Sequence, residues 1–448
     1  MIQFRTLFLS VFGLFMMACA REEIIVSEIS VQDTPIGMQA QKGRLRLKFK
    51  SRFAGKAEQA VYTRAGTGDI RIVSMKRLFP FAGKFEERTR KAGLHLWFDE
   101  QTPVTRALAL LGDTTEIEIA EPVYIIRNTG GEGTVPVRSA GERNSDGTAP
   151  FNDPELSRQW HYSNTGELPN SVAGADINLF AAWQKNQGSR EVIVAVIDGG
   201  IDYRHEDLTG NVGNPAELFG EPGVDDDGNG YIDDIYGWNF INGTNQIEAD
   251  DHGTHVAGTI GAENNNGVGV CGIAGGHGGN TGVWLLSCQL FGTIDGREVS
   301  ASFPEMIKYA ADAGAVIAQN SWGYENITYL PRADQEAIDY FIQYAGVDER
   351  GEQTGPMKGG VVIFAAGNEN KDYRTYPAAY EKVVSVAAYA PDYKKSWYSN
   401  FADWVDIAAP GGTYGYGRKY NGECPVYSTL PDNQYGYMQG TSMACPHV

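Results

Sequence analysis

Near-continuous apolar runs, rich in β-branched residues, recur along the chain from residue 151 onward. They cover residues 192–197, 283–290, 315–318, 361–365 and 383–388. Runs without polar alternation are typical of strands buried on both faces, and residues 300–312 and 333–344 between them have helical spacing. This alternation of strands and helices predicts an α/β fold with a doubly wound, mostly parallel sheet over residues 151–448.

The first part of the chain has a different pattern. Residues 44–49 alternate polar and apolar side chains, as a half-buried strand does, and residues 94–98 and 117–126 are further strand candidates. Residues 103–111 are a predicted helix, because Thr102 suits the N-cap and Pro103 the first helical position. These elements predict a small α+β unit at 41–128, followed by a polar, exposed linker at 129–150.

The N-terminus has the pattern of an export signal, predicted at residues 1–19 and followed by a spacer at 20–40. Arg5 precedes an apolar run at 7–18 that is too short to span a bilayer comfortably. Two cleavage patterns compete. Ala18-Cys19-Ala20 fits removal of the signal from a soluble secreted protein, whereas Met17-Ala18-Cys19 resembles a bacterial lipobox, in which Cys19 is lipidated. We favour the lipobox, so we expect an exported protein whose contact with a membrane is limited to this anchor.

Charge is distributed unevenly along the 448 residues. The chain carries a formal charge of −19, which argues against nucleic acid as its main partner. Residues 41–95 nevertheless contain 15 Lys and Arg against 4 Asp and Glu. This pattern predicts either that the basic unit docks on an acidic body or that it has an ordinary basic surface.

Cysteine spacing excludes the usual zinc patterns. Besides Cys19, the chain has Cys271, Cys288, Cys424 and Cys445, with no CxxC pair among them. Export permits disulfides, but the spacing does not distinguish bridges from buried thiols.

Three residues in apolar or glycine-rich settings are candidates for joint chemistry. Asp198 directly follows the apolar run 192–197, and a buried carboxylate needs a partner. Ser442 lies among small residues just before Pro446, which suits a loop-to-helix junction. Serine is a poor nucleophile without an adjacent base, and His252 supplies one whose tautomer a carboxylate would fix.

The motifs around these residues resemble those of the subtilisin-like serine peptidases, the subtilase family. The motifs are Ala-Val-Ile-Asp-Gly-Gly at 195–200, His-Gly-Thr-His-Val-Ala-Gly at 252–258, Ala-Ala-Gly-Asn at 365–368 and Gly-Thr-Ser-Met-Ala at 440–444. They occur in the family's own order of Asp, His and Ser. The resemblance implies that Asp198 orients, His252 acts as the base and Ser442 attacks.

The same resemblance assigns further residues. It implies that the Asn368 amide completes the oxyanion hole and that Ser321-Trp322-Gly323 lines the specificity pocket and pairs with an extended substrate. It makes His255 a structural residue and Tyr376-Pro377 a cis-proline turn. The basic unit at 41–128 occupies the place of a pro-domain, which would template folding and inhibit the site until cleavage.

An acidic loop at 223–234 fits the first half of an EF-hand-type calcium loop. Asp225, Asp227 and Asn229 match the ligand spacing and Asp233 falls at the ninth position, while Tyr236 stands where the loop normally ends in Glu. So many carboxylates repel one another without a cation. Calcium is therefore the expected cofactor, with a solvated acidic loop as the alternative; no organic cofactor is expected.

The function that follows is a serine endopeptidase, made as a precursor, that hydrolyses extended proteins or peptides. The alternative is a peptidase-like, calcium-dependent surface or binding protein without turnover. Family members continue beyond the serine motif, whereas this chain stops six residues after Ser442. We therefore expect a C-terminally truncated domain in which the last turn frays and Ser442 is held poorly.

Overall fold

The structure is a computed structural model that describes residues 40–55, 75–100, 117–128, 135–136, 149–414 and 423–448. The predicted signal with Cys19, nearly all of the spacer, the helix 103–111 with Thr102 and most of the linker 129–150 lie outside these residues. Within them, no helix is long and apolar enough to cross a membrane.

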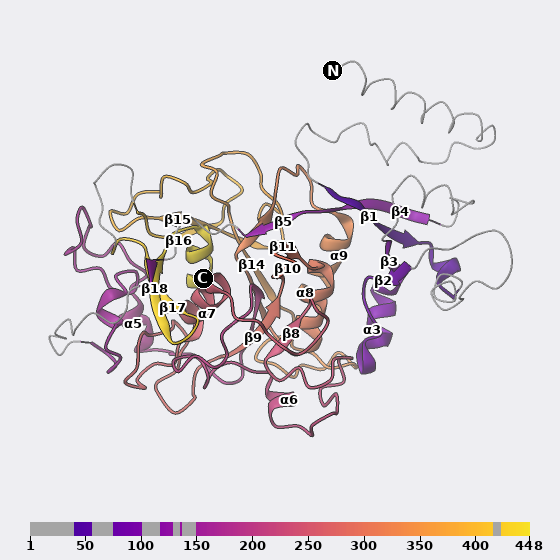
Figure 1. Ribbon diagram of the computed structural model, residues 1–448, viewed down its shortest axis with the longest axis horizontal. Helices are drawn as coiled ribbons and strands as arrows, with labels where there is room; N and C mark the ends of the chain where they lie inside the picture. Colours follow the sequence, from indigo (N-terminus) through magenta and orange to yellow (C-terminus); the bar gives the residue numbers. More distant parts are fainter. Residues whose placement is uncertain (1–39, 56–74, 101–116, 129–134, 137–148, 415–422) are drawn as a thin grey trace, which may run out of the picture.

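A seven-stranded sheet forms the centre of the body, as the apolar runs predicted (Figure 1). Its strand order is β16-β15-β14-β12-β7-β9-β8, and every neighbouring pair is parallel. In that order the strands are Ile407–Pro410, Val384–Tyr389, Val361–Ala365, Ile317–Asn320, Ile193–Asp198, Trp284–Gln289 and Gly237–Asn239. The α/β fold predicted from the sequence is thus confirmed.

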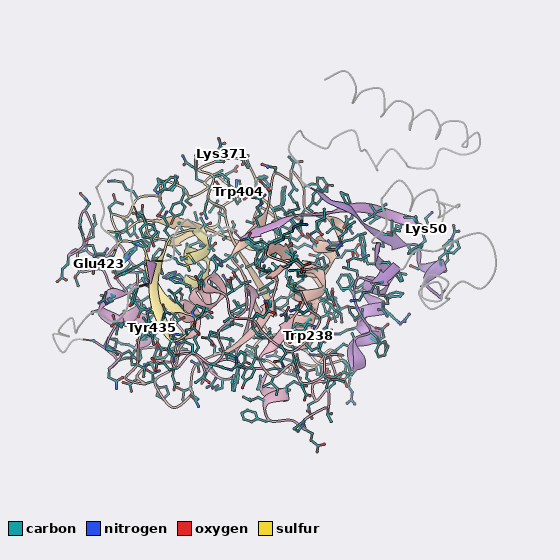
Figure 2. All side chains as sticks on the ribbon, in the orientation of Figure 1. Lys50, Trp238, Lys371, Trp404, Glu423 and Tyr435 are labelled. Carbon is teal, nitrogen blue, oxygen red and sulfur yellow. The ribbon has the colours of Figure 1, made fainter. Side chains whose placement is uncertain are left out.

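Strand β7 lies in the middle of this sheet and is buried on both faces. Ile193, Ala195 and Ile197 belong to one apolar cluster, and Val194 and Val196 belong to another. This alternation explains why the sequence of β7 has no polar positions, because both faces of the strand are covered by other elements. Side chains fill the space between strands and helices throughout the body (Figure 2).

Helices cover the two faces of the sheet. Residues of α8 and α9 pack in the same apolar cluster as Ile193, on one face of the sheet. Residues of α7 pack in the same cluster as Val194, on the other face, and α10 contributes to the clusters on that second face. These helices span Asp251–Gly261 (α7), Phe303–Asp312 (α8), Arg332–Tyr344 (α9) and Thr441–Ala444 (α10). Shorter helices are α5 (Leu179–Trp183) and α6 (Pro215–Leu218), and β10 (Phe291–Ile294) and β11 (Arg297–Ser300) form a hairpin.

An antiparallel sheet built from residues 40–124 lies against the body beside α8 and α9 (Figure 1). Its order is β2-β3-β1-β4, with strands at Met75–Arg77, Trp97–Glu100, Ala40–Phe49 and Ile117–Tyr124, and α3 spans Glu86–Lys91. The strand predicted at 94–98 begins later, because Gly93, with φ +77°, leads into a 3₁₀ turn at Leu94–Leu96.

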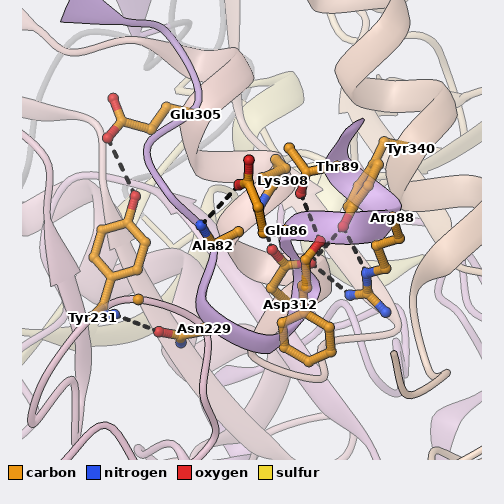
Figure 3. Close-up of polar contacts among 12 residues, drawn as sticks. Ala82, Glu86, Arg88, Thr89, Asn229, Tyr231, Glu305, Lys308, Asp312 and Tyr340 are labelled. Atoms are coloured by element: carbon orange, nitrogen blue, oxygen red, sulfur yellow. Dashed lines mark hydrogen bonds and ion pairs between the residues drawn. The ribbon is translucent and has the colours of Figure 1, made fainter. Parts of the chain in front are cut away.

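This N-terminal sheet docks through apolar and ionic contacts together. Phe79 and Trp97 belong to the same apolar cluster as residues of α8 and α9. The guanidinium of Arg46 lies 3.1 Å from Asp334 of α9. Figure 3 shows the second contact, in which the guanidinium of Arg88 lies 2.5 Å from Asp312 of α8. The basic unit therefore contacts acidic side chains of the body. Of the two possibilities predicted from its charge, the structure shows docking on the body.

Two short strands continue from the N-terminal sheet onto the body. The strand predicted at 117–126 ends at Tyr124, and β5 (Ile126–Asn128) pairs instead with β13 (Trp322–Tyr324) of the body in antiparallel register. Strand β6 (Val135–Pro136) extends the hairpin of β17 (Val426–Leu430) and β18 (Gln434–Met438). Residues on both sides of the 129–134 segment are thus attached to the body.

The final turn is held more firmly than we expected. Thr441–Ala444 form α10, Cys445–His447 form a 3₁₀ turn, and all of these residues are buried. Ala444 and Cys445 pack with Ala388 and Ala409 of the sheet. This burial supplies packing partners that a six-residue helix would lack in isolation.

Candidate active site

Asp198 is the last residue of β7 and is completely buried. Its Oδ1 atom accepts a hydrogen bond from the backbone N–H of Gly199 at 2.7 Å. Carboxyl ends of parallel strands are where such sheets place their ligand sites, and the apolar run that precedes Asp198 fixes its position at that edge.

His252 lies in the first turn of α7. The N-cap residue Asp250 accepts hydrogen bonds from the backbone N–H groups of His252 and Gly253, both at 3.0 Å. Gly253 packs directly on the strand that carries Asp198, since a Cβ atom there would meet the Gly199 carbonyl oxygen at 2.3 Å. The glycine after the histidine therefore lets α7 approach β7 closely.

The two side chains meet in the interior. Nδ1 of His252 lies 2.7 Å from Oδ1 of Asp198, and Nε2 is buried with no hydrogen-bond partner among the described residues. Burial lowers the pKa of His252, but the charge and hydrogen bond of Asp198 and the charge of Asp250 outweigh it, so the pKa is raised above 6.5. The pair thus favours a proton on Nδ1 and leaves Nε2 as the basic atom.

Ser442 is the second residue of α10, after Gly440 with φ +150°. Its hydroxyl donates to the carbonyl oxygen of Ser321 at 3.0 Å, and the Ser321 hydroxyl donates to the carbonyl oxygen of Ser442 at 2.7 Å. This reciprocal pair joins α10 to the end of β12. Since α10 also packs against α7, the structure brings the elements that carry Ser442 and His252 together.

Asn368 follows Gly367, whose φ is +99°, beyond the end of β14. Its Oδ1 atom accepts from both the backbone N–H and the hydroxyl of Thr441, each at 2.9 Å. The oxygen end of the amide is fixed toward Thr441, which turns the NH₂ end away from it. Asn368 is therefore tied to the residue next to Ser442.

The Ser321-Trp322-Gly323 segment has two roles in the structure. The Trp322 side chain is fully buried, with ring centroids 4.7 Å from Phe303 and 5.2 Å from Phe364, so it is part of the core. The backbone of Trp322 and Gly323 instead pairs with Asn128 and Arg127 of β5. This edge can thus hold an extended peptide.

A separate group of buried carboxylates lies around the acidic loop. Oxygen atoms of Glu217, Asp227 and Asp234 lie within 4.8 Å of one another. Burial, together with the charge of Asp234, raises the pKa of Asp227 to about 8, and burial raises that of Asp234 to about 6. One oxygen each of Glu217 and Asp234 is buried without a hydrogen-bond partner in the described part. An all-oxygen set with unsatisfied atoms fits a calcium ion.

This group and the four predicted ligands share only Asp227. Asp225 accepts hydrogen bonds from the N–H groups of Asn229 and Gly230, and Asp233 accepts from that of Gly223. Asn229 donates to Asp227 and Asp234. The loop pattern could not indicate Glu217, because this residue belongs to α6 and reaches the loop through the fold.

Two sequence models of protein families match separate parts of the chain. A sequence model of the subtilase family matches residues 189–448, and a model of the N-terminal region of that family matches residues 54–166. The chain belongs to the subtilase family. The N-terminal sheet contributes to its pro-domain.

Relatives of this subtilase include serine proteinases. The thermophilic serine proteinase of Bacillus sp. (strain AK1) is 32% identical over 268 residues, which cover 60% of this chain and 52% of the relative. Thermitase of Thermoactinomyces vulgaris is 30% identical over 268 residues, covering 60% of this chain and 75% of thermitase. The chain spans about half the length of the first of these relatives.

Solved structures share the fold over most of this subtilase. The epidermin leader peptide processing serine protease of Staphylococcus aureus gives a TM-score of 0.56 at 19% identity, covering 91% of this chain and 86% of the other. Fervidolysin of Fervidobacterium pennivorans gives a TM-score of 0.51 at 22% identity, covering 91% of this chain and 54% of the other.

The sequence patterns did not indicate three supporting contacts in this subtilase. Asp250 caps α7 beside His252, Thr441 holds Asn368, and the Ser321 hydroxyl holds α10. The first carried a usable signal, because an Asp before an apolar helix is a typical N-cap. The other two contacts join distant segments, so no local pattern could have indicated them.

Proposed function

We propose that this subtilase is a serine endopeptidase in which Ser442, His252 and Asp198 act as one unit. The observation that carries the proposal is the buried Asp198–His252 pair, whose Nε2 atom has no other hydrogen-bond partner in the described chain. Nε2 takes the proton of the Ser442 hydroxyl as the serine attacks a substrate carbonyl. Asp198 stabilises the imidazolium that forms, and His252 then returns the proton to the leaving amine.

Asn368 would stabilise the negative charge on the attacked carbonyl oxygen. Its NH₂ group and the backbone N–H of Ser442 are the proposed donors. The two hydrogen bonds from Thr441 to Oδ1 support this assignment, because they set which end of the amide faces away from α10. Such a donor acts most strongly when it is fixed before the reaction.

Substrates would bind as an extended strand on the edge of β13. Strand β5 occupies that edge in the precursor, and β6 pairs with β18 on the other side of residues 129–134. We infer that the pro-domain inhibits the enzyme by holding this edge and that activation requires cleavage of the connecting chain. Pairing with β13 requires an extended backbone. It therefore favours peptides and extended segments of proteins over compactly folded proteins.

Two accessory features belong to the proposal. Calcium would be held by Glu217, Asp227 and Asp234, where it would neutralise carboxylates that burial otherwise drives toward protonation. Export, with Cys19 as a lipid anchor, rests on the N-terminal sequence pattern alone. Globomycin-sensitive processing of the full-length gene product would test the anchor, since soluble secretion does not need lipoprotein signal peptidase.

A phosphonate directed at active-site serines tests the enzymatic proposal. The mature, full-length gene product should gain one phosphonyl adduct, located at Ser442 by peptide mass. Ala variants of His252 should label far more slowly, whereas His277→Ala, at an exposed histidine, should label normally. Labelling that ignores His252 would contradict the proposal, as would a folded protein that is never labelled.

A further inference from the structure

Strand β5 occupies the β13 edge as a peptide that leads toward the candidate nucleophile. Asn128 pairs with Trp322, Arg127 with Gly323 and Ile126 with Tyr324. Ser321, one residue before Trp322, carries the carbonyl that accepts the Ser442 hydroxyl. The antiparallel register therefore directs the chain from Ile126 through Asn128 toward Ser442.

The side chains of Ile126 and Arg127 have different surroundings, as alternate positions of a strand do. Ile126 is 6% exposed and belongs to the apolar cluster that includes Tyr324 and Ile327. Arg127 is on the open side, and its Nε lies 2.8 Å from a carboxylate oxygen of Glu325. Glu325 directly follows β13, so its position is fixed by the strand that holds the peptide.

A substrate must take the place of β5 to pair with β13. These two strands form a two-stranded sheet, and β5 is the sole strand neighbour of β13 in the described chain. A substrate in the same register presents one side chain to the apolar cluster and the next to Glu325. The negative charge of Glu325 then attracts a cation and repels a carboxylate at that position.

We propose that Glu325 is a specificity-determining residue, which makes the enzyme favour extended polypeptides with Arg or Lys at the position of Arg127. This inference rests on the proposed endopeptidase function and names its substrate class. The ion pair is partly open to solvent, with side-chain exposures of 60% for Arg127 and 27% for Glu325. The preference is therefore modest, about two- to fivefold for a cation over a neutral residue.

The test uses the mature, full-length gene product, with active enzyme counted by phosphonate titration. Quenched fluorescent peptides copy residues 122–136 and carry Arg, Gln or Glu at position 127. The wild type should cleave them in the order Arg, Gln, Glu, with kcat/KM differing by about two- to fivefold at each step. The differences should shrink in 1 M salt, because the pair is solvent-accessible.

Charge reversal separates specificity from general damage. Glu325→Lys should reverse the order, so that the Glu peptide becomes the best substrate, a gain that a misfolded enzyme cannot produce. Glu191→Lys makes the same charge change at an exposed residue that precedes the N-terminal end of β7, whereas Asp198 lies at the C-terminal end. This control variant should keep the wild-type order. If Glu325→Lys also keeps that order, the inference is wrong while the endopeptidase stands. If wild-type enzyme that reacts with the phosphonate cleaves no peptide or protein at all, the proposed endopeptidase function itself is wrong.

Discussion

Asp198 and His252 lie 54 residues apart in the chain, yet their side chains are joined at 2.7 Å in the interior. The contact depends on the close approach of α7 to β7, which Gly253 permits. Asp250, the N-cap of α7, adds a second negative charge near the imidazole. The basicity of His252 is therefore set by two carboxylates acting against burial.

This balance predicts a shift of the pH profile in Asp250→Asn. A base must be neutral, so kcat/KM should rise with pH through the pKa of His252, which the charges of Asp198 and Asp250 raise from the ordinary histidine value. Removing the Asp250 charge lowers that pKa, and the acid limb should move to lower pH. Asparagine keeps an oxygen for the N-cap, so the helix should remain intact. An unmoved limb, or one displaced to higher pH, would exclude this role of Asp250.

Arg88 should be a main anchor of the pro-domain. It is buried, donates to Tyr340 and to the carbonyl of Val347, and lies 2.5 Å from Asp312. We expect Arg88→Ala to destabilise the precursor by about 3 kcal/mol, because Asp312 then loses one of its two buried cations. Calorimetry of full-length precursors that also carry Ser442→Ala, which prevents processing, measures this loss.

Arg90→Ala is the matched control for Arg88. Arg90 lies on the same helix, but its side chain is 42% exposed, and its partner Glu86 keeps a second ion pair with Arg77 when Arg90 is lost. Its loss should cost less than about 1 kcal/mol. Equal effects of the two substitutions would mean that the buried contact does not anchor the pro-domain.

The calcium proposal predicts different effects for two adjacent residues. At a calcium concentration a hundredfold above its dissociation constant, the mature domain should gain roughly 2.7 kcal/mol of stability. Asp234→Asn should remove most of this gain, because Asp234 belongs to the buried group. Asp233→Asn should retain the calcium-dependent gain in stability, since the Asp233 carboxylate instead accepts a hydrogen bond from the backbone N–H of Gly223. Melting temperatures with calcium and with chelator measure both, and a chelator-insensitive wild type would count against the site.

Local sequence patterns predicted the parallel sheet and the placement of Asp198 well. A short apolar run rich in β-branched residues, such as that of β7, favours a strand covered on both faces, and the polar residue that ends it then lies at the sheet edge. The motif resemblance then named His252, Ser442 and Asn368. Neither source could indicate the bonds between Thr441 and Asn368, which depend on how α10 packs beside β14.

The buried carboxylate group of Glu217, Asp227 and Asp234 and the boundary between β4 and β5 were harder to predict for the same reason. An EF-hand spacing rule assumes that all ligands come from one loop, whereas here Glu217 reaches the group from α6. Residues 117–126 have the composition of one strand, but Ile126 pairs with β13 of the body. Composition does not record which sheet a strand residue joins, because either pairing buries its apolar side chain.

Asn368 should contribute to the rate of reaction more than to substrate binding. We expect Asn368→Ala to lower kcat by on the order of a hundredfold or more with KM little changed, as removal of the corresponding donor does in subtilisin. Thr441→Val should give a smaller loss of the same kind, because it removes one of the two bonds that hold the amide. A rise in KM without loss of kcat would assign Asn368 to ground-state binding instead.

The most direct test of the central claim is turnover by the full-length gene product with Ser442→Ala. We predict that kcat falls on the order of a millionfold, the magnitude established for subtilisin, and that the precursor stays unprocessed while its melting temperature is little changed. Ser171→Ala, in the loop before α5, should process and turn over normally. Ordinary turnover by Ser442→Ala, with the substitution verified by intact mass, would contradict the proposed mechanism.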